Sequence, residues 1–404
     1  MSTLQTTNLK HPDSSGTQVT FTSGGDTSVS GSTTFSSPIK ASKLENASTT
    51  SGGVEVDTDG HVQVDGLQIP TAGALTGRNM IINGAMAVSQ RYIINSGQTA
   101  SAFRACDRFA MAIGSLGTWT VEQHPVSPDE FSNSFKVTCT TAEASPSNNA
   151  AAFILYVVEG KDAQRLGFGT ASAKPITLSF WVQSNKTGNA SFAILQNDNS
   201  NKLASFQYSI STANTWEYKT ITIPADVAGL INNDTGEGLQ LEWWLNSGST
   251  YQGGSHQNTW GGFSNPNRNP SNLGVGATFD DYYQITGVQL EVGEKASRFE
   301  HEDFSQTLIK CQRYFKKIRL ERSFYTASTN SFTQRFGIDL APHMRIAPDI
   351  LQQNGSLARL GKTYSFYNNI GDAGTLIYAQ LDGSQSSVVE FTRMSDLLWL
   401  DAEF

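Results

Sequence analysis

One stretch of the sequence, residues 251–268, gathers side chains that could bind a ligand. Sugar rings stack on the faces of Trp and Tyr, and amide side chains hydrogen-bond to sugar hydroxyl groups. A long loop with this content predicts glycan contacts, and the candidates are Trp260, Tyr251, His256, Asn258, Asn265 and Arg268. The alternative is that Trp260 is a buried anchor for the loop, at an edge of the fold or between chains, because burial is the commoner use of Trp.

Acidic side chains are the second feature that could do chemistry. Cleavage of a glycosidic bond needs two carboxylates that flank the bond, one of them with a raised pKa. The acidic residues to consider are Asp280, Asp281, Glu300, Glu302, Asp303, Glu159 and Asp162. Asp280 and Asp281 precede an expected strand, where consecutive side chains face opposite ways, and a turn or a cation site explains them as well. The sequence also lacks a Gly-x-Ser-x-Gly elbow and a phosphate-binding glycine loop. We expect no catalytic residues and no enzymatic activity.

Metal-ligand patterns are absent from the sequence. The six histidines are scattered, and neither HExxH nor CxxC occurs. The turn at Asp57–Gly60 resembles the start of a calcium loop but lacks the downstream glutamate. His301, Glu302 and Asp303 lie just before an expected helix, where acidic residues favour the N-terminus in any case. We therefore expect no metal site built by these residues.

The composition favours an all-β protein and excludes some partners. Only 16% of the 404 residues are charged and 38% are hydrophobic, while Ser, Thr, Asn, Gln and Gly supply most of the polarity. The net charge of −8 makes nucleic acid an unsuitable partner. Apolar runs such as 150–158 are too short to span a bilayer, and no secretory signal is expected. The three cysteines suit reduced thiols in a protein made in a cytoplasm.

Residues 1–75 differ from the rest of the chain and are predicted to form a stalk or attachment segment. They contain only two aromatic residues, Phe21 and Phe35, so the segment cannot fold alone as a compact monomer. Short alternating runs occur at 19–21, 54–56 and 62–64, and the last two frame an Asp-Gly turn typical of a β-hairpin. Identical chains could share the few apolar residues in a thin β-stalk. Plain disorder is the alternative.

Residues 76–303 are predicted to form a central antiparallel jelly-roll sandwich. Ile176, Leu178, Phe180 and Val182 alternate with Thr177, Ser179 and Trp181, and similar runs occur around 192–194, 221–223, 239–245 and 285–292. Turns rich in Asn, Gly and Ser separate these runs, as in sandwiches and jelly rolls. Gly287 interrupts the last run as at a β-bulge.

Residues 304–320 are predicted to form a single amphipathic linking helix. Apolar side chains fall on one face at the helical period, namely Phe304, Leu308, Cys311, Phe315 and Ile318. Strand-like alternation returns after this segment. Residues 321–404 are therefore predicted to form a small C-terminal β domain.

Several short stretches of the sequence are weak signals alone but specific in their order and spacing. They are GRNMIINGAMAVSQR at 77–91 with CDRF at 106–109; ITLSFWV at 176–182 with NTWEY at 214–218 and ITIP at 221–224; ITGVQLEVG at 285–293 with FEH at 299–301 and CQRYF at 311–315; and the ending DAEF at 401–404. Together they resemble a family of tailed-bacteriophage tail-fibre-like and virion structural proteins, common in phages of marine bacteria and cyanobacteria.

The resemblance implies a jelly roll similar to carbohydrate-binding modules in a trimeric fibre. We expect a homotrimeric tail fibre of the virion, assembled in the cytoplasm of a bacterial host, that attaches to host cell-surface glycan without covalent chemistry. Other virion proteins would be partners through the N-terminal segment, and the family analogy allows a structural Ca²⁺ in the jelly roll. Two alternatives stay open: a head fibre or capsid decoration protein, and a glycan-cleaving tailspike.

Overall fold

The computed structural model describes the backbone of residues 76–198, 201–326, 341–354 and 390–404, and elsewhere only separate strands. Side chains are described for residues 76–198, 201–318, 341–349 and 399–404. The chain divides into two units, Met1–Ile69 and Pro70–Phe404. The turn predicted at 57–60 lies outside the described residues.

The described residues of the first unit form seven strands of two or three residues each. The predicted pairing of 54–56 with 62–64 is confirmed, because Val54 lies opposite Val64 in an antiparallel register. The strands form two small sheets, ordered β1-β2-β3 and β4-β5-β6-β7. Their bounds are β1 (Asn8–Leu9), β2 (Val19–Phe21), β3 (Thr27–Val29), β4 (Lys43–Leu44), β5 (Val54–Val56), β6 (Val62–Val64) and β7 (Leu67–Ile69).

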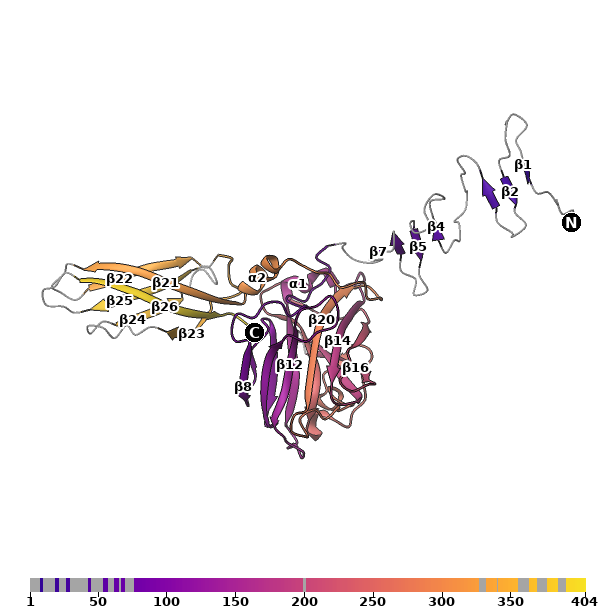
Figure 1. Cartoon of the computed structure of the whole chain (residues 1–404), viewed down its shortest axis with the longest axis horizontal. Helices are drawn as coiled ribbons and strands as arrows, with labels where there is room; N and C mark the ends of the chain where they lie inside the picture. Colours follow the sequence, from indigo (N-terminus) through magenta and orange to yellow (C-terminus); the bar gives the residue numbers. More distant parts are fainter. Residues whose placement is uncertain are drawn as a thin grey trace. The chain divides into compact units, whose positions relative to one another are not determined.

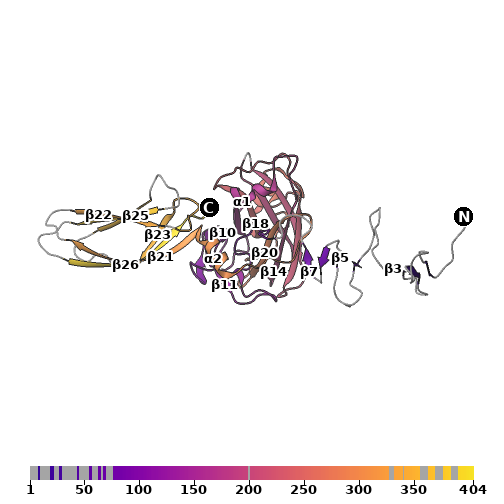
Figure 2. The ribbon, with the colours of Figure 1, turned by 90° about the horizontal axis from the view of Figure 1, so that it is seen from above.

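The main body of the second unit is an antiparallel β-sandwich, as predicted (Figures 1 and 2). One layer has seven strands in the order β19-β16-β15-β18-β13-β10-β9. Those strands are β9 (Ala102–Phe103), β10 (Phe109–Gly114), β13 (Ala151–Glu159), β15 (Gly188–Gln196), β16 (Lys202–Ile210), β18 (Glu237–Ser247) and β19 (Gly261–Gly262).

The second layer has six strands in the order β17-β14-β20-β12-β11-β8. In Figure 1 the labelled strands of this layer follow in the order β8, β12, β20 and β14, and β11 lies between β8 and β12. Its strands are β8 (Ile94–Gln98), β11 (Thr118–His124), β12 (Ser134–Thr141), β14 (Ile176–Ser184), β17 (Glu217–Ile223) and β20 (Tyr282–Val292). The predicted bulge at Gly287 is confirmed, because the register of β20 against β14 shifts there and Gly287 has a φ of 60°.

The core lies between the two layers. Phe180 from β14 packs edge-on against Trp243 from β18, and Phe192 from β15 contacts the same indole. The phenol groups of Tyr208 and Tyr283 are hydrogen-bonded at 2.5 Å across the core, so neither buried hydroxyl is left without a partner. The alternating apolar residues of each strand supply this core because successive side chains face opposite sides of a sheet.

The linking helix is shorter than the predicted 304–320, and this part of the prediction was wrong. Helix α2 spans Phe304–Gln312, and strand β21 (Phe315–Thr326) follows it. All twelve residues of β21 pair with β26 (Glu390–Asp401), and this long ladder replaces the helical hydrogen bonds. The helical face was also partly wrong, because Phe304 is 59% exposed while Cys311 and Phe315 are 0% exposed.

The C-terminal strands form two three-stranded antiparallel sheets, ordered β21-β26-β23 and β22-β25-β24. Strand β21 runs across the boundary predicted between residues 320 and 321. The remaining elements of the second unit are α1 (Gly160–Ala163), the short 3₁₀ turns η1 (Gln164–Leu166), η2 (Ser249–Tyr251) and η3 (Asn265–Asn267), and strands β22 (Phe332–Asp339), β23 (Asp349–Asn354), β24 (Thr363–Asn368) and β25 (Leu376–Gly383). No helix in the described part of the chain is long and apolar enough to cross a membrane.

A buried network of charges holds the last residues of the chain against the sandwich. Arg108 forms an ion pair with Glu403, and its guanidinium lies 3.5 Å from the ring centre of Tyr314. Arg91 donates to Asp401 at 2.8 Å. These residues belong to the motif stretches at 77–91, 106–109, 311–315 and 401–404. Motifs that are far apart in the sequence therefore meet at one place in the structure.

Candidate functional site

Trp260, the first predicted glycan contact, is held by the fold. Its indole N–H donates to the carbonyl oxygen of Pro224 at 2.8 Å, and its ring packs edge-on against Phe168 at 5.7 Å. The side chain is partly buried against the main core. This geometry is that of an anchor for the loop, although part of the ring stays accessible.

Tyr251 and Arg268 are also engaged within the protein. The ring of Tyr251 lies 5.1 Å from that of Trp244, and the Arg268 guanidinium lies 5.0 Å from the same indole. Arg268 forms an ion pair at 2.5 Å with Glu242, which is fully buried on β18. The pair neutralises a carboxylate in the sheet and ties residues 251–268 to the outer face of the seven-stranded layer.

The other three predicted contacts differ in exposure. His256 is half-buried, its Nε2 lies 3.0 Å from Ser271 Oγ, and burial lowers the pKa of the imidazole. Asn265 accepts from Arg268 at 3.2 Å, whereas Asn258 is exposed. All six candidates lie in one loop region. Most of their polar groups form hydrogen bonds or ion pairs within the protein.

The acidic residues considered for catalysis are spread over separate places. Asp281 accepts hydrogen bonds from the backbone N–H groups of Gly276 and Thr278, as expected of a turn residue. Glu159 is buried and accepts from Arg313 and from the hydroxyl of Tyr314. Among the described residues, no three His, Cys, Asp or Glu side chains lie close enough to hold a metal ion.

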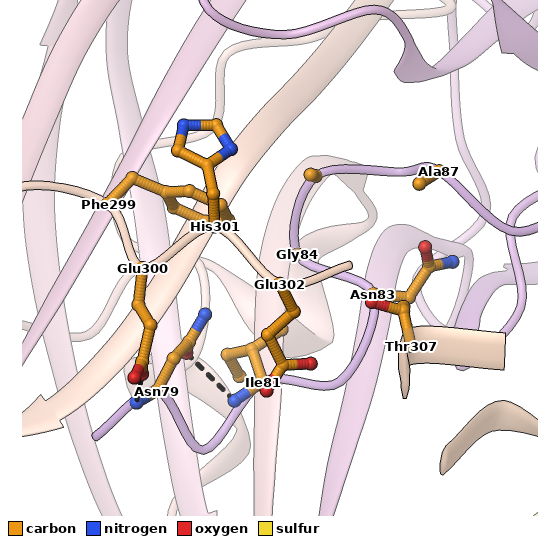
Figure 3. A pocket seen from close by; sticks show the side chains of 11 residues that line it. Asn79, Ile81, Asn83, Gly84, Ala87, Phe299, Glu300, His301, Glu302 and Thr307 are labelled. Atoms are coloured by element: carbon orange, nitrogen blue, oxygen red, sulfur yellow. Dashed lines mark hydrogen bonds between the residues drawn. The ribbon is translucent and has the colours of Figure 1, made fainter. Parts of the chain in front are cut away.

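A small polar pocket lies where two motif stretches meet, residues 79–87 and 299–302 (Figure 3). The carboxylate of Glu300 accepts from the backbone N–H groups of Gly77 and Asn79, at 2.6 and 2.9 Å. In Figure 3 the imidazole of His301 is directed away from the carboxylates of Glu300 and Glu302. The volume of about 40 Å³ holds a few water molecules but not a sugar ring. We interpret this pocket as a joint between segments.

The outer face of the six-stranded layer presents a row of aromatic side chains. Trp181 on β14 and Tyr218 on β17 lie directly opposite each other, with ring centres 5.3 Å apart. Phe180 and Val182 are buried in the core, so Trp181 faces outward by strand alternation. Tyr218 is 44% exposed. This pair is an accessible aromatic surface on a rigid sheet.

The row continues across β20 because Gly287 has no side chain. A Cβ atom at this position would lie 2.7 Å from the ring of Phe131 and 3.0 Å from that of Trp181. The two rings therefore approach over the glycine backbone. Beyond Phe131, the row extends to Phe299 at 5.0 Å and to His301 at 5.3 Å. We call Tyr218, Trp181, Phe131, Phe299 and His301 the aromatic row.

Amide and hydroxyl groups flank the aromatic row. The hydroxyl of Tyr282 donates to the side chain of Asn214 at 2.8 Å, and the amide of Gln183 donates to the carbonyl oxygen of Asn214. Lys136 lies 5.1 Å from the ring centre of Tyr282. The face thus combines apolar rings with donors and acceptors, which is the content expected of a surface that binds polar ligands.

Sequence reasoning placed the strands of this face but did not single out the row. Strand alternation places Trp181 on the side opposite the core residues, and Tyr218 belongs to the motif stretch NTWEY. The available signal was aromatic side chains at the solvent-facing positions of two strands. Nothing in the linear sequence shows that those strands are neighbours.

Comparisons with known proteins found no matching family model and no matching curated protein. Solved structures with some similarity include the enzymatically active domain of tailspike protein 4 of bacteriophage CBA120, at 13% identity, a TM-score of 0.28 and 54% coverage of this chain. The match spans 22% of the tailspike domain's length.

Two carbohydrate-binding domains are also similar. A family 11 carbohydrate-binding module of a Clostridium thermocellum cellulase matches at 12% identity and a TM-score of 0.26, over 50% of this chain and 96% of the module. The N-terminal cellulose-binding domain of a Cellulomonas fimi β-1,4-glucanase matches at 12% identity and a TM-score of 0.24, over 44% of this chain and 90% of the domain. At this level of similarity, the ligands and activities of these proteins are not assigned to the present chain.

Proposed function

We propose that this protein is a non-enzymatic appendage of a tailed-phage particle, a homotrimeric tail fibre that binds host cell-surface glycan through its β-sandwich. The motif stretches at 77–91, 176–182 and 285–293 support the virion role through the family that they resemble. The observation that carries the binding function is the aromatic row on the six-stranded layer, where the exposed ring of Tyr218 lies beside Trp181.

The chemistry of the aromatic row suits a sugar chain. The apolar faces of pyranose rings pack on aromatic rings, while hydroxyl groups exchange hydrogen bonds with amides such as Gln183 and Asn214. A row of several rings can accept consecutive sugars. Three copies in a trimer would raise the avidity, so that each site can be weak.

The test compares binding of host polysaccharide by matched aromatic variants of the full chain. Tyr218→Ala removes an exposed ring of the row, and we expect roughly tenfold weaker binding, because one aromatic contact contributes about 1 kcal/mol or somewhat more. Phe304→Ala removes a ring that is similarly exposed on α2 and should leave binding unchanged.

A third variant separates the aromatic row from the loop at 251–268. Phe263 is 40% exposed within that loop, and Phe263→Ala should leave binding unchanged if the row is the site. Loss of binding in Phe263→Ala with normal binding in Tyr218→Ala would contradict the proposal and assign the site to the loop. Release of new reducing ends from the polysaccharide would contradict the non-enzymatic part. Electron microscopy of labelled particles tests the position on the tail.

A further inference from the structure

The charges beside the aromatic row bear on the kind of sugar chain that it can accept. Four cationic side chains border the row or the amides that flank it, namely Lys219, Arg298, Lys136 and Lys186. A polysaccharide with carboxylate or sulfate groups would use such cations as binding partners. Each of the four forms an ion pair with a carboxylate of this chain instead.

Beside Tyr218, the edge strand β17 balances its own charge. Lys219 follows Tyr218 and Glu217 precedes it, and Lys219 Nζ lies 2.6 Å from Glu217 Oε2. The backbone N–H groups of Ser211 and Thr212 also donate to the carboxylate of Glu217, each at 2.8 Å. These bonds fix the carboxylate in place, so Lys219 has its counter-ion within the same strand.

The cations beside the flanking amides are balanced in the same way. Lys136 on β12 lies opposite Glu122 on β11 in the antiparallel ladder, and Lys136 Nζ is 3.5 Å from Glu122 Oε1. Lys186 Nζ is 3.3 Å from Asp281 Oδ2, close to the start of β20. Opposite charges therefore alternate across this part of the face and largely cancel at a distance.

Two further cations lie towards the covered part of the same face. Arg78 Nε is 3.6 Å from the buried carboxylate of Glu291. Lys295 is exposed beyond the end of β20 and follows the exposed Glu294 directly, so these two residues add no net charge. Neither place offers an excess of positive charge to an acidic polymer.

The part of the row around Phe131 is bordered by carboxylates. Arg298 forms an exposed ion pair with Glu130 at 2.5 Å. Asp129 and Asp303, each two residues from a ring of the row, are exposed, and no described cation forms an ion pair with either. Acidic sugars laid along the row would meet these like charges, and like charges across an interface repel.

Neutral groups supply the hydrogen bonds of the face. The hydroxyl of Tyr282 donates to the side chain of Asn214 at 2.8 Å, and the amide of Gln183 donates to the backbone carbonyl of Asn214 at 3.0 Å. These side chains hold one another in place at the surface. A ligand that exchanges hydrogen bonds with them needs hydroxyl groups and no charge.

We propose that the aromatic row takes an uncharged glycan and discriminates against polysaccharides that carry carboxylate or sulfate groups. This inference rests on the proposed function, because it names the class of glycan for the same site. The rings of Tyr218 and Trp181 pack on the apolar faces of the sugars, and the neighbouring amides bind their hydroxyl groups. The bordering cations are held by carboxylates of the protein.

The test measures binding of the full chain to matched polysaccharides that differ in charge. Hydroxyethyl cellulose and dextran are neutral, and carboxymethyl cellulose and dextran sulfate are their anionic counterparts. We expect a neutral polymer to bind roughly tenfold or more tightly than its anionic counterpart, because like charges repel at the row. Its affinity should change by less than about twofold as sodium chloride is raised from about 50 to about 500 mM, because no charges are paired on binding.

The outcomes separate this inference from the proposed function. Tighter binding of an anionic polymer, or affinity that falls steeply with salt, would overturn the inference. Binding of none of the four polymers would overturn it as well. The proposed function fails only if Tyr218→Ala leaves the binding of host polysaccharide unchanged, so an acidic glycan whose binding depends on Tyr218 would sink the inference alone.

Variants that release one cation provide the converse test. Glu122→Gln removes the counter-ion of Lys136 but keeps the shape of the side chain, and Glu217→Gln does the same for Lys219. Each should raise the affinity for dextran sulfate several-fold at low salt, and this gain should disappear at high salt. Binding of the neutral polymers should stay unchanged.

A matched control releases a cation on the other layer of the sandwich. Asp226→Asn removes the counter-ion of Lys202 on β16, and should leave the affinity for dextran sulfate unchanged. Melting temperatures establish that all three variants are folded. Unchanged affinity for dextran sulfate in folded Glu122→Gln and Glu217→Gln proteins would overturn the role given to the ion pairs.

Discussion

At the scale of single residues, exposure separates side chains that can meet a ligand from those that serve the fold. Arg268 and Tyr251 have the side-chain types of a glycan site, yet they pack on Trp244 and neutralise Glu242. Trp181 and Tyr218 lie on the outer face of a sheet, and they neither pack on Trp244 nor neutralise a buried charge. The surroundings of a side chain therefore decide its role more than its type does.

The pair between Arg268 and Glu242 should be a strong determinant of stability. Arg268→Met leaves a fully buried carboxylate without its cation, and the free energy of unfolding should fall by about 3–5 kcal/mol. Urea denaturation measures the change. Arg298→Met breaks an exposed pair with Glu130 and should cost no more than about 1 kcal/mol. If the two variants lose similar amounts of free energy of unfolding and only Arg268→Met loses glycan binding, then Arg268 contacts the ligand instead.

Asp107 should make stability depend on pH. Burial raises the pKa of this carboxyl from 3.8 to about 6, against the opposing effect of Arg91. Because the folded state holds the proton more tightly than the unfolded state, the stabilising contribution is complete below pH 3.8 and is lost as the pH rises through about 6. Between these limits the free energy of unfolding should fall by about 3 kcal/mol relative to Asp107→Asn. Parallel pH profiles for wild type and variant would contradict this.

At the scale of elements, the helix ends where a strand partner becomes available. Residues 304–318 have an apolar period that fits a helix, and the sequence alone cannot show that β26 will pair with residues from Phe315 onward. Phe315 is still buried, as its place in the pattern predicted, but it is buried as the first residue of β21. Its ring packs edge-on against Trp399 at 5.7 Å.

Two phenylalanines from the predicted helical face form a matched test of this arrangement. Phe315→Ala should lower the free energy of unfolding by about 3 kcal/mol or more, because it leaves a cavity beside Trp399 and Arg91. Phe304→Ala, at an exposed ring on α2, should change it by less than about 0.5 kcal/mol. Thermal or urea unfolding measures both. Equal losses of free energy of unfolding in the two variants would mean that the face of α2 bearing Phe304 packs against another protein molecule in solution.

At the scale of the whole molecule, the chain combines a unit of very short strands with a large sandwich. The strands described in Met1–Ile69 have two or three residues each, and isolated strands of this length are only marginally stable. The sandwich unit, in contrast, has a continuous core between two layers. That the first unit depends on association between chains stays a prediction from the sequence.

We predict that the full protein sediments as a homotrimer and that a shortened chain beginning at Gly77 loses much of the trimer's stability. The reason is that the few apolar residues of the first 75 would be buried only between copies. Sedimentation velocity over a range of concentrations measures both species. A well-ordered monomer of the full chain, or an unchanged trimer without the first 76 residues, would contradict the prediction.

The sequence by itself determined the features that depend on neighbours along the chain. Strand alternation placed Phe180 inward and Trp181 outward, and a glycine within an apolar run marked the bulge at Gly287, because both follow from local backbone geometry. Only the tertiary structure decided which strands became neighbours. That pairing built the aromatic row from β14, β17 and the segments beside β20, turned Arg268 towards Glu242, ended α2 at Gln312 and brought Arg91, Arg104 and Trp399 to one pocket. Contacts between residues hundreds of positions apart depend on the packing of whole sheets, and no local pattern records them.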